Sequence, residues 1–554
     1  MKRLFILIAL FGFVAIGCTD KDTDNNQDNN QTEEPSQGGE NTPDQEEPVF
    51  DYEGLDSYTI AREGEVVFID ITTNIEYTVE IPDNAKHWIA FAYESRTELK
   101  ERLKFTIIKN PRQEGRSATV LLKNLDQEVL QSITFNQERG ENPNAIKFAD
   151  KTVETLCLDN WDHNDDGDLT YEEAAAVTDI ATVFAHSAIE SFTELEYFTG
   201  ITALVDYAFE GCDKLTAVTI PDQILSIGLG AFKYCSLLKE VQISDSVTTI
   251  GDNAFEECGS IESMSIGKGV TSFGRNSFKG CTGTLSINSN IPDAGEYYAY
   301  GIFYGSRFST VTIGSNVTTI GSSAFEGSQI TSVEIADNVG TIGKYAFRDC
   351  TALKTVTFPA NLSSIGISCF ERCESLQEAS LPSNVKALPT NLFKGCASLA
   401  SVSFSNEVTS IGAGAFDGCK ALTAINIPSG VSTIEDYALR DCSSLSQVTI
   451  EKGVKKLGAL SFSGCTSLTT ITLPTSVTSI DEKCFLNCKN LKTVYCKPTT
   501  PPTLSTQVFQ YFDSSSLANK NIACTIYVPT SSVSTYKSKS NWSNYKSLIV
   551  GYNF

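Results

Sequence analysis

The sequence contains few of the residues on which catalysis and nucleic-acid binding depend. Its 554 residues include three histidines, His87, His163 and His186, and none lies near a Ser, Cys or Asp pattern that pairs a nucleophile with its base. Basic residues number 42 against 68 acidic ones, which gives a formal charge of −26, and no basic patch is evident. We therefore expect a protein that is not an enzyme and does not bind DNA or RNA.

Long apolar runs are also scarce. The one at residues 4–16 follows a basic start, which is typical of a secretory signal and too short for a stable membrane helix. It ends in Val-Ala-Ile-Gly-Cys, which resembles a bacterial lipobox in which Cys18 becomes the lipidated first residue of the mature chain. Ordinary cleavage nearby is the alternative. The resemblance implies a signal peptide at residues 1–18 and a lipid anchor as the only membrane attachment.

Residues 19–48 consist mainly of Asn, Gln, Asp, Glu, Pro, Gly and Thr without apolar periodicity. Such a segment cannot bury enough apolar surface to become ordered, so we expect an acidic, disordered tether. The acidic residues directly after Cys18 resemble the surface-export signal of Bacteroidetes lipoproteins. That resemblance implies an outer-membrane protein that faces the cell exterior, while a soluble spacer is the alternative.

Residues 49–140 show short β-type runs separated by Asn, Pro and Gly, a pattern typical of a small β-sandwich. His-Trp-Ile ending at Ile89, Asn-Pro beginning at Asn110, Gly-Arg ending at Arg116 and Phe-Asn-Gln ending at Gln137 resemble the BACON domain, an immunoglobulin-like module of Bacteroidetes surface proteins. The resemblance implies either carbohydrate binding or a spacer. We favour the spacer, because Trp88 is more simply a core residue.

Residues 162–173, within a segment at 141–189, form a complete twelve-residue EF-hand loop. Gly167 permits the sharp turn, Leu169 is expected to point inward, and residues 151–160 and 171–177 are expected to form short flanking helices. The predicted calcium ligands are the side chains of Asp162, Asn164 and Asp166, the carbonyl of Asp168, the hydroxyl of Thr170 or a water, and both carboxylate oxygens of Glu173.

No second loop is recognisable, which argues against a calcium sensor. An unpaired extracellular site of roughly 0.1 to 1 mM affinity that stiffens the joint between sandwich and repeats is more plausible. The alternative is an acidic turn that caps the second helix without metal.

From residue 209 to 509 an Ala-Phe pair, or a variant of it, recurs fourteen times, most often every 23 residues. A fixed period of this size predicts a solenoid whose stacked units share one core. The pattern Leu-x-x-Ile-x-Ile places three apolar side chains on one face of a short strand, which predicts a parallel sheet. The anchor positions are Phe209, Phe232, Phe255, Phe278, Phe303, Phe325, Phe347, Phe370, Phe393, Phe416, Leu439, Phe462, Phe485 and Phe509.

This unit resembles the BspA-type leucine-rich repeat over residues 190–528, and residues 529–554 resemble the closing cap of such arrays. The predicted fold class is mainly β: a leucine-rich repeat solenoid of about 14 coils, preceded by an immunoglobulin-like β-sandwich and a short helical EF-hand segment. The resemblance implies a surface protein that attaches to host proteins or to other bacteria.

Eleven of the 17 cysteines lie three residues after an anchor. The same slot holds Ser306, Ser328 and Phe512 in other units, so it is not a disulfide position. We expect a ladder of buried thiols that act as small apolar residues. Cys496 and Cys524, outside this slot, are the best candidates for a disulfide.

The outward positions of the predicted first strands are mostly hydroxyls: of 26 residues, 17 are Ser or Thr and none is Lys or Arg. This face suits at most a weak, multivalent contact. Residues 291–308 form the one irregular unit, and there Tyr297, Tyr298 and Tyr300 are the candidate contact patch. We predict adhesion to a host or bacterial surface protein; the alternative is a glycan-binding lipoprotein that captures polysaccharide.

Overall fold

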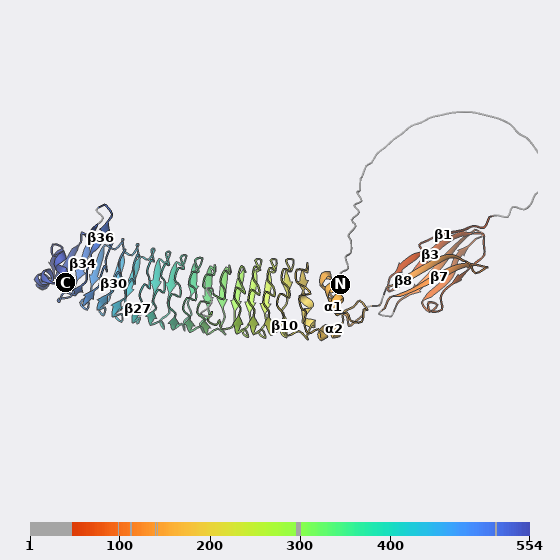
Figure 1. The fold of residues 1–554 in the computed structure, drawn as a ribbon, viewed down its shortest axis with the longest axis horizontal. Coiled ribbons are helices and arrows are strands. Elements are labelled where there is room, and N and C mark those ends of the chain that lie inside the picture. Colours follow the sequence, from red (N-terminus) through yellow and green to blue (C-terminus); the bar gives the residue numbers. More distant parts are fainter. Residues whose placement is uncertain are drawn as a thin grey trace, which may run out of the picture. The chain divides into compact units, whose positions relative to one another are not determined.

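The computed structural model describes residues 47–97, 99–110, 114–138, 140, 142–294, 301–515 and 518–554. The signal peptide, Cys18, the tether up to residue 46 and Tyr297, Tyr298 and Tyr300 lie outside the described residues. The chain divides into two compact units, Met1–Arg139 and Gly140–Phe554, which are drawn in Figure 1. Among the described residues, no helix is both long enough and apolar enough to cross a membrane.

The first unit consists of two four-stranded sheets that share one apolar core. One sheet has the order β1 (Phe50–Glu53), β3 (Gly64–Thr73), β6 (Lys100–Ile108), β5 (Ile89–Arg96). The other has the order β2 (Ser57–Ile60), β8 (Val129–Gln137), β7 (Arg116–Asn124), β4 (Tyr77–Glu80). Alternate residues of the long strands are buried, as in β6, so each sheet contributes one face to the core.

The residues that carry the BACON resemblance cluster in this sandwich. The guanidinium of Arg116 lies 4.5 Å from the centre of the Trp88 ring, and Arg116 Nε donates to Gln137 Oε1 at 2.8 Å. Asn110 Nδ2 donates to the carbonyl oxygens of Glu114 and Glu138 at 2.9 Å. Trp88 is 3 % exposed, so the expectation that it is a core residue is confirmed.

The second unit begins with α1 (Lys151–Trp161) and α2 (Tyr171–Ala176), which confirms the two short helices expected from the sequence. Both belong to the core of the solenoid, because Val153 of α1 and Ala174 of α2 are fully buried in the same apolar cluster as the coils. The ring of Trp161 lies 5.5 Å from that of Phe198, which follows η1 (Thr193–Tyr197). The helices therefore close the N-terminal end of the stack.

The solenoid is built from two rows of parallel strands, one strand of each row per regular coil (Figure 1). In the first row the register advances by one coil at each step, as from Val241 to Met264 to Leu285. These middle residues are buried and their neighbours face outward, so the predicted strand pattern is confirmed.

The strands of the first row are β9 (Ser191–Phe192), β11 (Ala217–Val218), β13 (Glu240–Ile243), β15 (Ser263–Ile266), β17 (Thr284–Ile287), β18 (Thr310–Ile313), β20 (Ser332–Ile335), β22 (Thr355–Thr357), β24 (Glu378–Ser380), β26 (Ser401–Ser403), β28 (Ala424–Ile427), β30 (Gln447–Ile450), β32 (Thr470–Leu473), β34 (Thr493–Cys496), β38 (Thr525–Pro529) and β39 (Ile549–Tyr552). Those of the second row are β10 (Ala203–Leu204), β12 (Ser226–Ile227), β14 (Thr249–Ile250), β16 (Ser272–Phe273), β19 (Thr319–Ile320), β21 (Thr341–Ile342), β23 (Ser364–Ile365), β25 (Ala387–Leu388), β27 (Ser410–Ile411), β29 (Thr433–Ile434), β31 (Lys456–Leu457), β33 (Ser479–Ile480) and β35 (Thr503–Leu504).

The anchor rings stack along the axis of the solenoid. Phe325 and Phe347 lie 5.2 Å apart with an interplanar angle of 1°. Phe303 keeps its place in the stack, 4.6 Å from Phe325, although it belongs to the irregular unit. Phe184 stacks on Phe209 at 5.4 Å, so one further coil precedes the first one that the repeat motif reveals.

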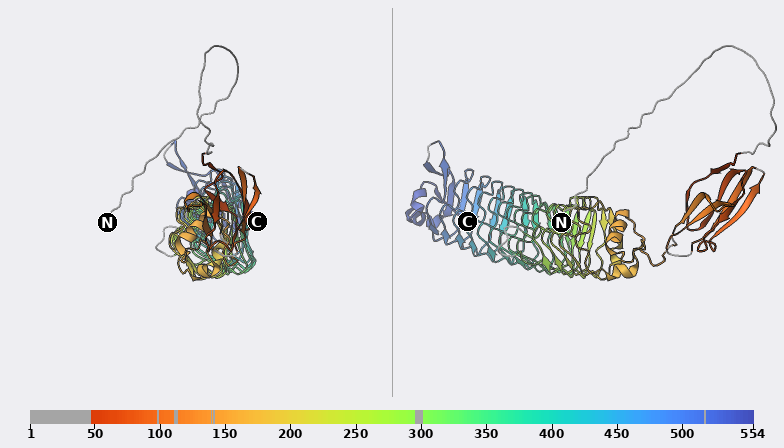
Figure 2. Two further views of the ribbon diagram at one scale, coloured as in Figure 1. Left: turned by 90° about the vertical axis from the view of Figure 1, so that its right-hand side faces the viewer. Right: turned by 45° about the vertical axis from the view of Figure 1, so that its right-hand side comes forward.

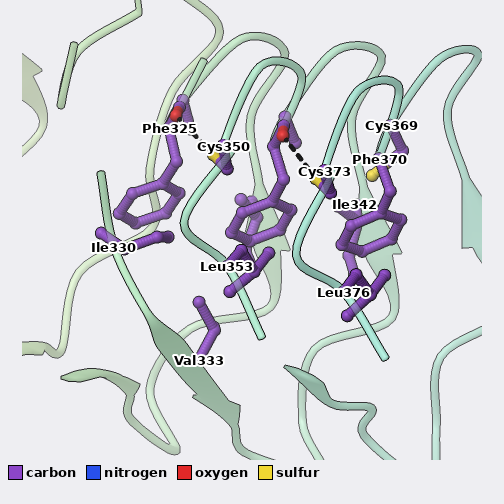
Figure 3. Packing of buried hydrophobic residues seen from close by; sticks show 14 of the residues in the cluster. Phe325, Ile330, Val333, Ile342, Cys350, Leu353, Cys369, Phe370, Cys373 and Leu376 are labelled. Atoms are coloured by element: carbon purple, nitrogen blue, oxygen red, sulfur yellow. Dashed lines mark hydrogen bonds between the residues drawn. The ribbon is translucent and has the colours of Figure 1, made fainter. Parts of the chain in front are cut away.

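The cysteine slot forms a second ladder beside the rings. Figure 3 shows the thiols of Cys350 and Cys373, each of which donates to the carbonyl oxygen of the anchor one coil earlier, Phe325 or Phe347, at 3.1 Å. All sixteen cysteines that the structure describes are buried and free. The predicted thiol ladder is therefore confirmed.

The suggested disulfide between Cys496 and Cys524 is wrong, because both thiols are free and are buried separately in the core of the C-terminal end. Cys496 lies on β34, and its sulfur is 3.4 Å from the hydroxyl of Tyr536 in α3 (Val533–Ser538). Trp542 of η3 (Trp542–Tyr545) is fully buried and donates to Pro502 O at 2.8 Å. Together with η2 (Thr530–Ser532), these short helices cover the last coil.

Candidate functional site

The predicted calcium loop is a compact turn held by its own carboxylates. Asp162 ends α1, and its Oδ2 accepts from Gly167 N at 2.8 Å, where φ is +76°. The carboxylate of Glu173 accepts from Thr170 N at 2.9 Å and from Asn164 Nδ2 at 3.0 Å. Thr170 and Glu173 also form a capping box at the start of α2.

The donor set of this loop suits a hard cation. No three His, Cys, Asp or Glu side chains among the described residues gather closely enough to hold a metal by themselves. However, Asp162 Oδ1 is buried without a hydrogen-bond partner, which is a costly state for a carboxylate oxygen. The remaining predicted ligands are oxygens of Asn, Asp, Thr, Glu and the backbone, which is the chemistry that calcium prefers.

A short stretch of chain pairs with the loop in place of a second EF-hand. Ile146 N donates to Leu169 O at 2.8 Å, and Tyr171 N donates to Asn144 O at 3.0 Å. Leu169 is 1 % exposed, which confirms that its side chain points inward. Because the loop shares a core with the coils, its place is at the N-terminal cap of the solenoid.

The outer face of the first strand row is polar along most of its length. At β13 to β17 the outward residues border a hollow of about 610 Å³, in which Gln242 and Ser265 are register partners and Thr219 and Asn288 add to the polar lining. No aromatic side chain lines this hollow among the described residues. This part of the face therefore offers hydroxyls and amides but no anchor for a tight contact.

The turns that carry the anchors, which we call the turn edge, present charged side chains instead of hydroxyls and amides. In each regular coil the residues two before and two after the anchor adopt positive φ, for example Asn391 at +57° and Gly395 at +76°. These two residues bend the chain sharply around the anchor, so the side chain that directly follows each anchor lies on the edge.

The residues directly after the anchors alternate in charge. Glu256 pairs with Lys233 at 3.0 Å and with Lys279 at 2.9 Å, and Asp417 pairs with Arg440 at 2.6 Å. Burial opposes ionisation of Glu256, but hydrogen bonds from both lysines outweigh it and hold its pKa below the ordinary value. The alternating residues are Glu210, Lys233, Glu256 and Lys279 and, after Tyr304, Glu326, Arg348, Glu371, Lys394, Asp417 and Arg440.

A groove of about 850 Å³ crosses the turn edge where this alternation ends. Gly395, Gly418 and Gly464 leave its floor without side chains. Lys420 and Lys489 line it, are exposed, and make no ion pair with the described residues. The next three anchors are followed by Ser463, Leu486 and Gln510, so this slot adds no acidic residue there; the groove is also lined by Asp441, whose carboxylate lies 3.8 Å from Arg440 Nε.

A hairpin closes the C-terminal end of the groove. It consists of β36 (Gln510–Asp513) and β37 (Ala518–Asn521) and stands out from the edge of the coils in Figures 1 and 2. Its Phe512 is 48 % exposed and lines the groove, while the Phe512 amide donates to Asn487 Oδ1 at 3.0 Å. Phe512 occupies a cysteine slot in the sequence, but the chain leaves the coil here and the ring points to the surface.

The groove was not predicted from the sequence. In the sequence, the charge of the residue that follows each anchor alternates and this alternation stops after Arg440, which could have indicated the groove. The hairpin has no such sequence signal. The predicted tyrosine patch lies outside the described residues, so its role stays a prediction. Among the described residues, the second strand row breaks between β16 and β19, where Phe273 and Asp293 border a hollow of about 280 Å³.

The model of the BspA type leucine rich repeat region matches residues 177–286, 202–330, 283–400 and 386–516, which together span more than half of the chain. The chain belongs to the BspA-type leucine-rich repeat family. The BspA-type match begins at residue 177 and so includes the coil of Phe184. Among curated proteins, none matches the chain.

Several solved structures are similar to this BspA-type chain. A leucine-rich repeat protein from Bacteroides ovatus is 21 % identical with a TM-score of 0.46, and the match covers 64 % of this chain and 88 % of that one. A leucine rich cell surface protein from Faecalibacterium prausnitzii is 23 % identical over 57 % and 84 % of the two chains, with a TM-score of 0.28. An internalin from Listeria monocytogenes is 14 % identical over 63 % and 95 %, with a TM-score of 0.23.

Proposed function

We propose that this chain is a lipid-anchored outer-membrane protein that faces the cell exterior and binds a protein partner through its solenoid. Its role is attachment to host proteins or to other cells, without catalysis. The lipobox-like sequence before Cys18 and the acidic tether support this location. The solved relative from Faecalibacterium prausnitzii is described as a cell surface protein, which is consistent with the proposal.

The groove on the turn edge is the observation that carries the proposal. Two lysines without acidic partners, Lys420 and Lys489, and a half-exposed Phe512 lie in one groove of a chain whose formal charge is −26. Exposed aromatic and basic side chains beside a pocket are typical of binding hot spots. We therefore assign to this groove a protein segment that presents acidic and apolar side chains.

Calcium is proposed to hold the N-terminal cap of this binding solenoid. When bound, the ion supplies a positive charge to which the orphaned Asp162 Oδ1 can bind. The residues that would hold it are Asp162, Asn164, Asp166 and Glu173 through side chains, Asp168 through its carbonyl and Thr170 through its hydroxyl or a water. Because α1 and α2 pack on the first coils, calcium would stabilise the start of the stack rather than form part of the groove.

The sandwich at residues 49–140 is proposed to be a spacer of the BACON type. Its Trp88 is covered by Arg116 and is therefore not available as a platform for a sugar ring. A spacer between the tether and the solenoid would increase the reach of the binding groove from the membrane.

The proposal is tested by capture of purified host extracellular-matrix proteins on immobilised residues 19–554, with calcium present. The double variant Lys420→Glu/Lys489→Glu reverses the charge of the groove. We expect it to lose at least about ten-fold in affinity for the captured protein, because each substitution replaces attraction to an acidic segment with repulsion.

A matched control is Lys452→Glu/Lys455→Glu, which makes the same charge change at two exposed lysines outside the groove. This control is expected to bind as the unmodified chain does. The proposal fails if the unmodified chain captures no protein from the panel, or if the groove and control variants bind equally well.

A further inference from the structure

The C-terminal end of the first strand row carries an exposed aromatic cluster. Tyr495 of β34 and Tyr527 of β38 stand opposite each other in register, and their rings stack at 5.3 Å. Tyr552 of β39 lies 5.4 Å from Tyr495 and 5.0 Å from Phe554. Tyr552 and Phe554 are 42 % and 49 % exposed, while the alternate residue Ile526 is fully buried.

This cluster interrupts a face that is otherwise made of hydroxyls. In the neighbouring strand β32, Thr472 is the register partner of Tyr495. Among the 26 outward positions of the predicted first strands, Tyr495 is the single aromatic residue. The cluster was missed because Tyr527, Tyr552 and Phe554 follow the last repeat and become neighbours of Tyr495 only through the pairing of β34, β38 and β39.

Beside the rings lies a hollow of about 650 Å³. Tyr552 and Phe554 form one side of it, and the rest is lined chiefly by short polar side chains, including Thr475, Thr530 and Asn553. Lys497 is the one charged residue in this lining, and its Nζ lies 5.8 Å from the centre of the Phe554 ring. Lys497 makes no ion pair with the described residues.

Although the whole chain has a formal charge of −26, its C-terminal end is basic. Residues 481–554 contain eight lysines and three acidic residues, Asp481, Glu482 and Asp513, which gives the side chains of this part a formal charge of +5. Asp513 is already paired with Lys520. The aromatic cluster and its hollow therefore lie in a part of the solenoid whose charge attracts an anionic polymer.

We propose that this surface, formed by Tyr495, Tyr527, Tyr552, Phe554 and Lys497, binds an acidic polysaccharide, a chain of pyranose rings that carry carboxylates. The aromatic rings stack against the apolar faces of sugar rings, and the tyrosine hydroxyls remain free to donate to sugar oxygens. The threonine and asparagine side chains of the hollow form hydrogen bonds with the sugar hydroxyls. Lys497 pairs with a carboxylate.

The chemistry of the lining favours a glycan over other anionic polymers. A protein hot spot needs an apolar pocket for side chains, but this hollow is lined largely by hydroxyl and amide groups. Single-stranded nucleic acid needs a groove whose basic residues follow the phosphates, and Lys497 is the sole basic residue of the lining. The surface differs in residues and partner class from the groove of Lys420 and Phe512, so the two proposals stand or fall separately.

The test is isothermal titration of residues 19–554, in the presence of a chelator, with three acidic probes: oligosaccharides of hyaluronate, of polygalacturonate and of polysialic acid. Each is compared with its carboxyl-reduced form. We expect at least one acidic probe to bind, and Tyr552→Ala to lower its affinity about ten-fold. Lys497→Gln is expected to weaken binding of that probe but not of its carboxyl-reduced form.

Two controls match these substitutions. Tyr234→Ala removes another exposed tyrosine, on the turn edge, and Lys537→Gln removes an exposed lysine of the same basic end outside the hollow. Both are expected to bind like the unmodified chain. The proposal is overturned if no acidic probe binds, if Tyr552→Ala and Tyr234→Ala bind equally, or if an oligothymidine displaces the glycan at equal concentration.

Discussion

The interior of the solenoid is nearly the same in every coil, whereas its turn edge changes along the stack. Inside, a phenylalanine ring and a thiol recur at fixed positions, as in Phe347 and Cys350. On the edge, the residue after the anchor alternates in charge and then becomes neutral beyond Arg440. The interior positions thus specify the fold, and the edge positions are free to specify what is bound.

We expect alkaline pH to destabilise the folded interior more than any of the substitutions described below. Burial raises the pKa of Cys350 and Cys496 to about 12, above the ordinary value of 9.0. Because the folded state holds the thiol proton more tightly than the unfolded state does, each thiol contributes stability that is fully present below pH 9 and is lost as pH rises towards 12. The loss is about 1.4 kcal/mol per pH unit for each thiol. Because the ladder repeats this loss, we expect the solenoid to unfold between pH 9 and 12, measured by circular dichroism.

Serine provides the control for this titration, since it occupies the same slot at Ser328 and does not ionise in this range. Replacing Cys350, Cys373 and Cys442, whose thiol pKa values are all raised by burial, with serine should move the midpoint of alkaline unfolding to higher pH. An unchanged midpoint would show that the thiols do not cause the transition.

Truncation of one anchor ring should have the next largest effect. Phe347 is fully buried between Phe325 and Phe370, at 5.2 and 5.3 Å. Phe347→Ala should lower the free energy of unfolding by about 3 to 5 kcal/mol, because the rigid neighbours cannot fill the cavity. Urea denaturation measures this loss.

The matched variant on the edge is Tyr345→Ala, two residues earlier in the same turn. Tyr345 is partly exposed and lies under the guanidinium of Arg348 at 4.2 Å, a contact worth about 0.5 to 1 kcal/mol. If both variants lose the same stability, the distinction between interior and edge is wrong.

Calcium should stabilise the N-terminal cap, where the interior is not built from repeats. For a site of roughly 0.1 to 1 mM affinity, 10 mM calcium should add about 1 to 3 kcal/mol to the free energy of unfolding. Glu173→Gln keeps a capping-box residue but removes a bidentate carboxylate, so this variant should lose the calcium response. Equal stabilisation of both proteins by calcium would exclude this loop as the site.

A small effect is also expected from the backbone of the turn edge. Gly280 has φ at +79°, and a Cβ there would lie 2.8 Å from Glu257 Oε2. Gly280→Ala should destabilise the chain by about 1 kcal/mol, measured by thermal melting. Gly259 has open space and no positive φ, so Gly259→Ala should not destabilise it; equal losses at both positions would contradict the role given to positive φ.

The sequence predicted the interior well because the interior repeats. The 23-residue period identified the solenoid, and the Ser residues in the cysteine slot, Ser306 and Ser328, correctly argued against a disulfide ladder. The suggested bridge between Cys496 and Cys524 failed because Cys496 fills the last apolar position of its strand motif, as the register partner of Leu473, and is therefore a core residue. The segment around Ile146 that pairs with Leu169 could not be predicted either, since it carries no motif of its own.

The binding surfaces were harder to predict because they depend on departures from the repeat. The groove needs the β36–β37 hairpin, and the aromatic cluster needs β38 and β39 to pair beside β34. Val494 of β34 pairs with Ile526 of β38 across 32 residues instead of the usual 23, so the repeat period does not reveal that these strands are neighbours.

Hydroxyl-radical footprinting of the chain bound to a captured protein tests the central claim most directly. Phe512 on the turn edge and Tyr552 on the strand face are both about half exposed in the structure. The account predicts that the protein partner shields Phe512 from oxidation and leaves Tyr552 as reactive as in the free chain. Shielding of Tyr552 with an unprotected Phe512 would contradict it.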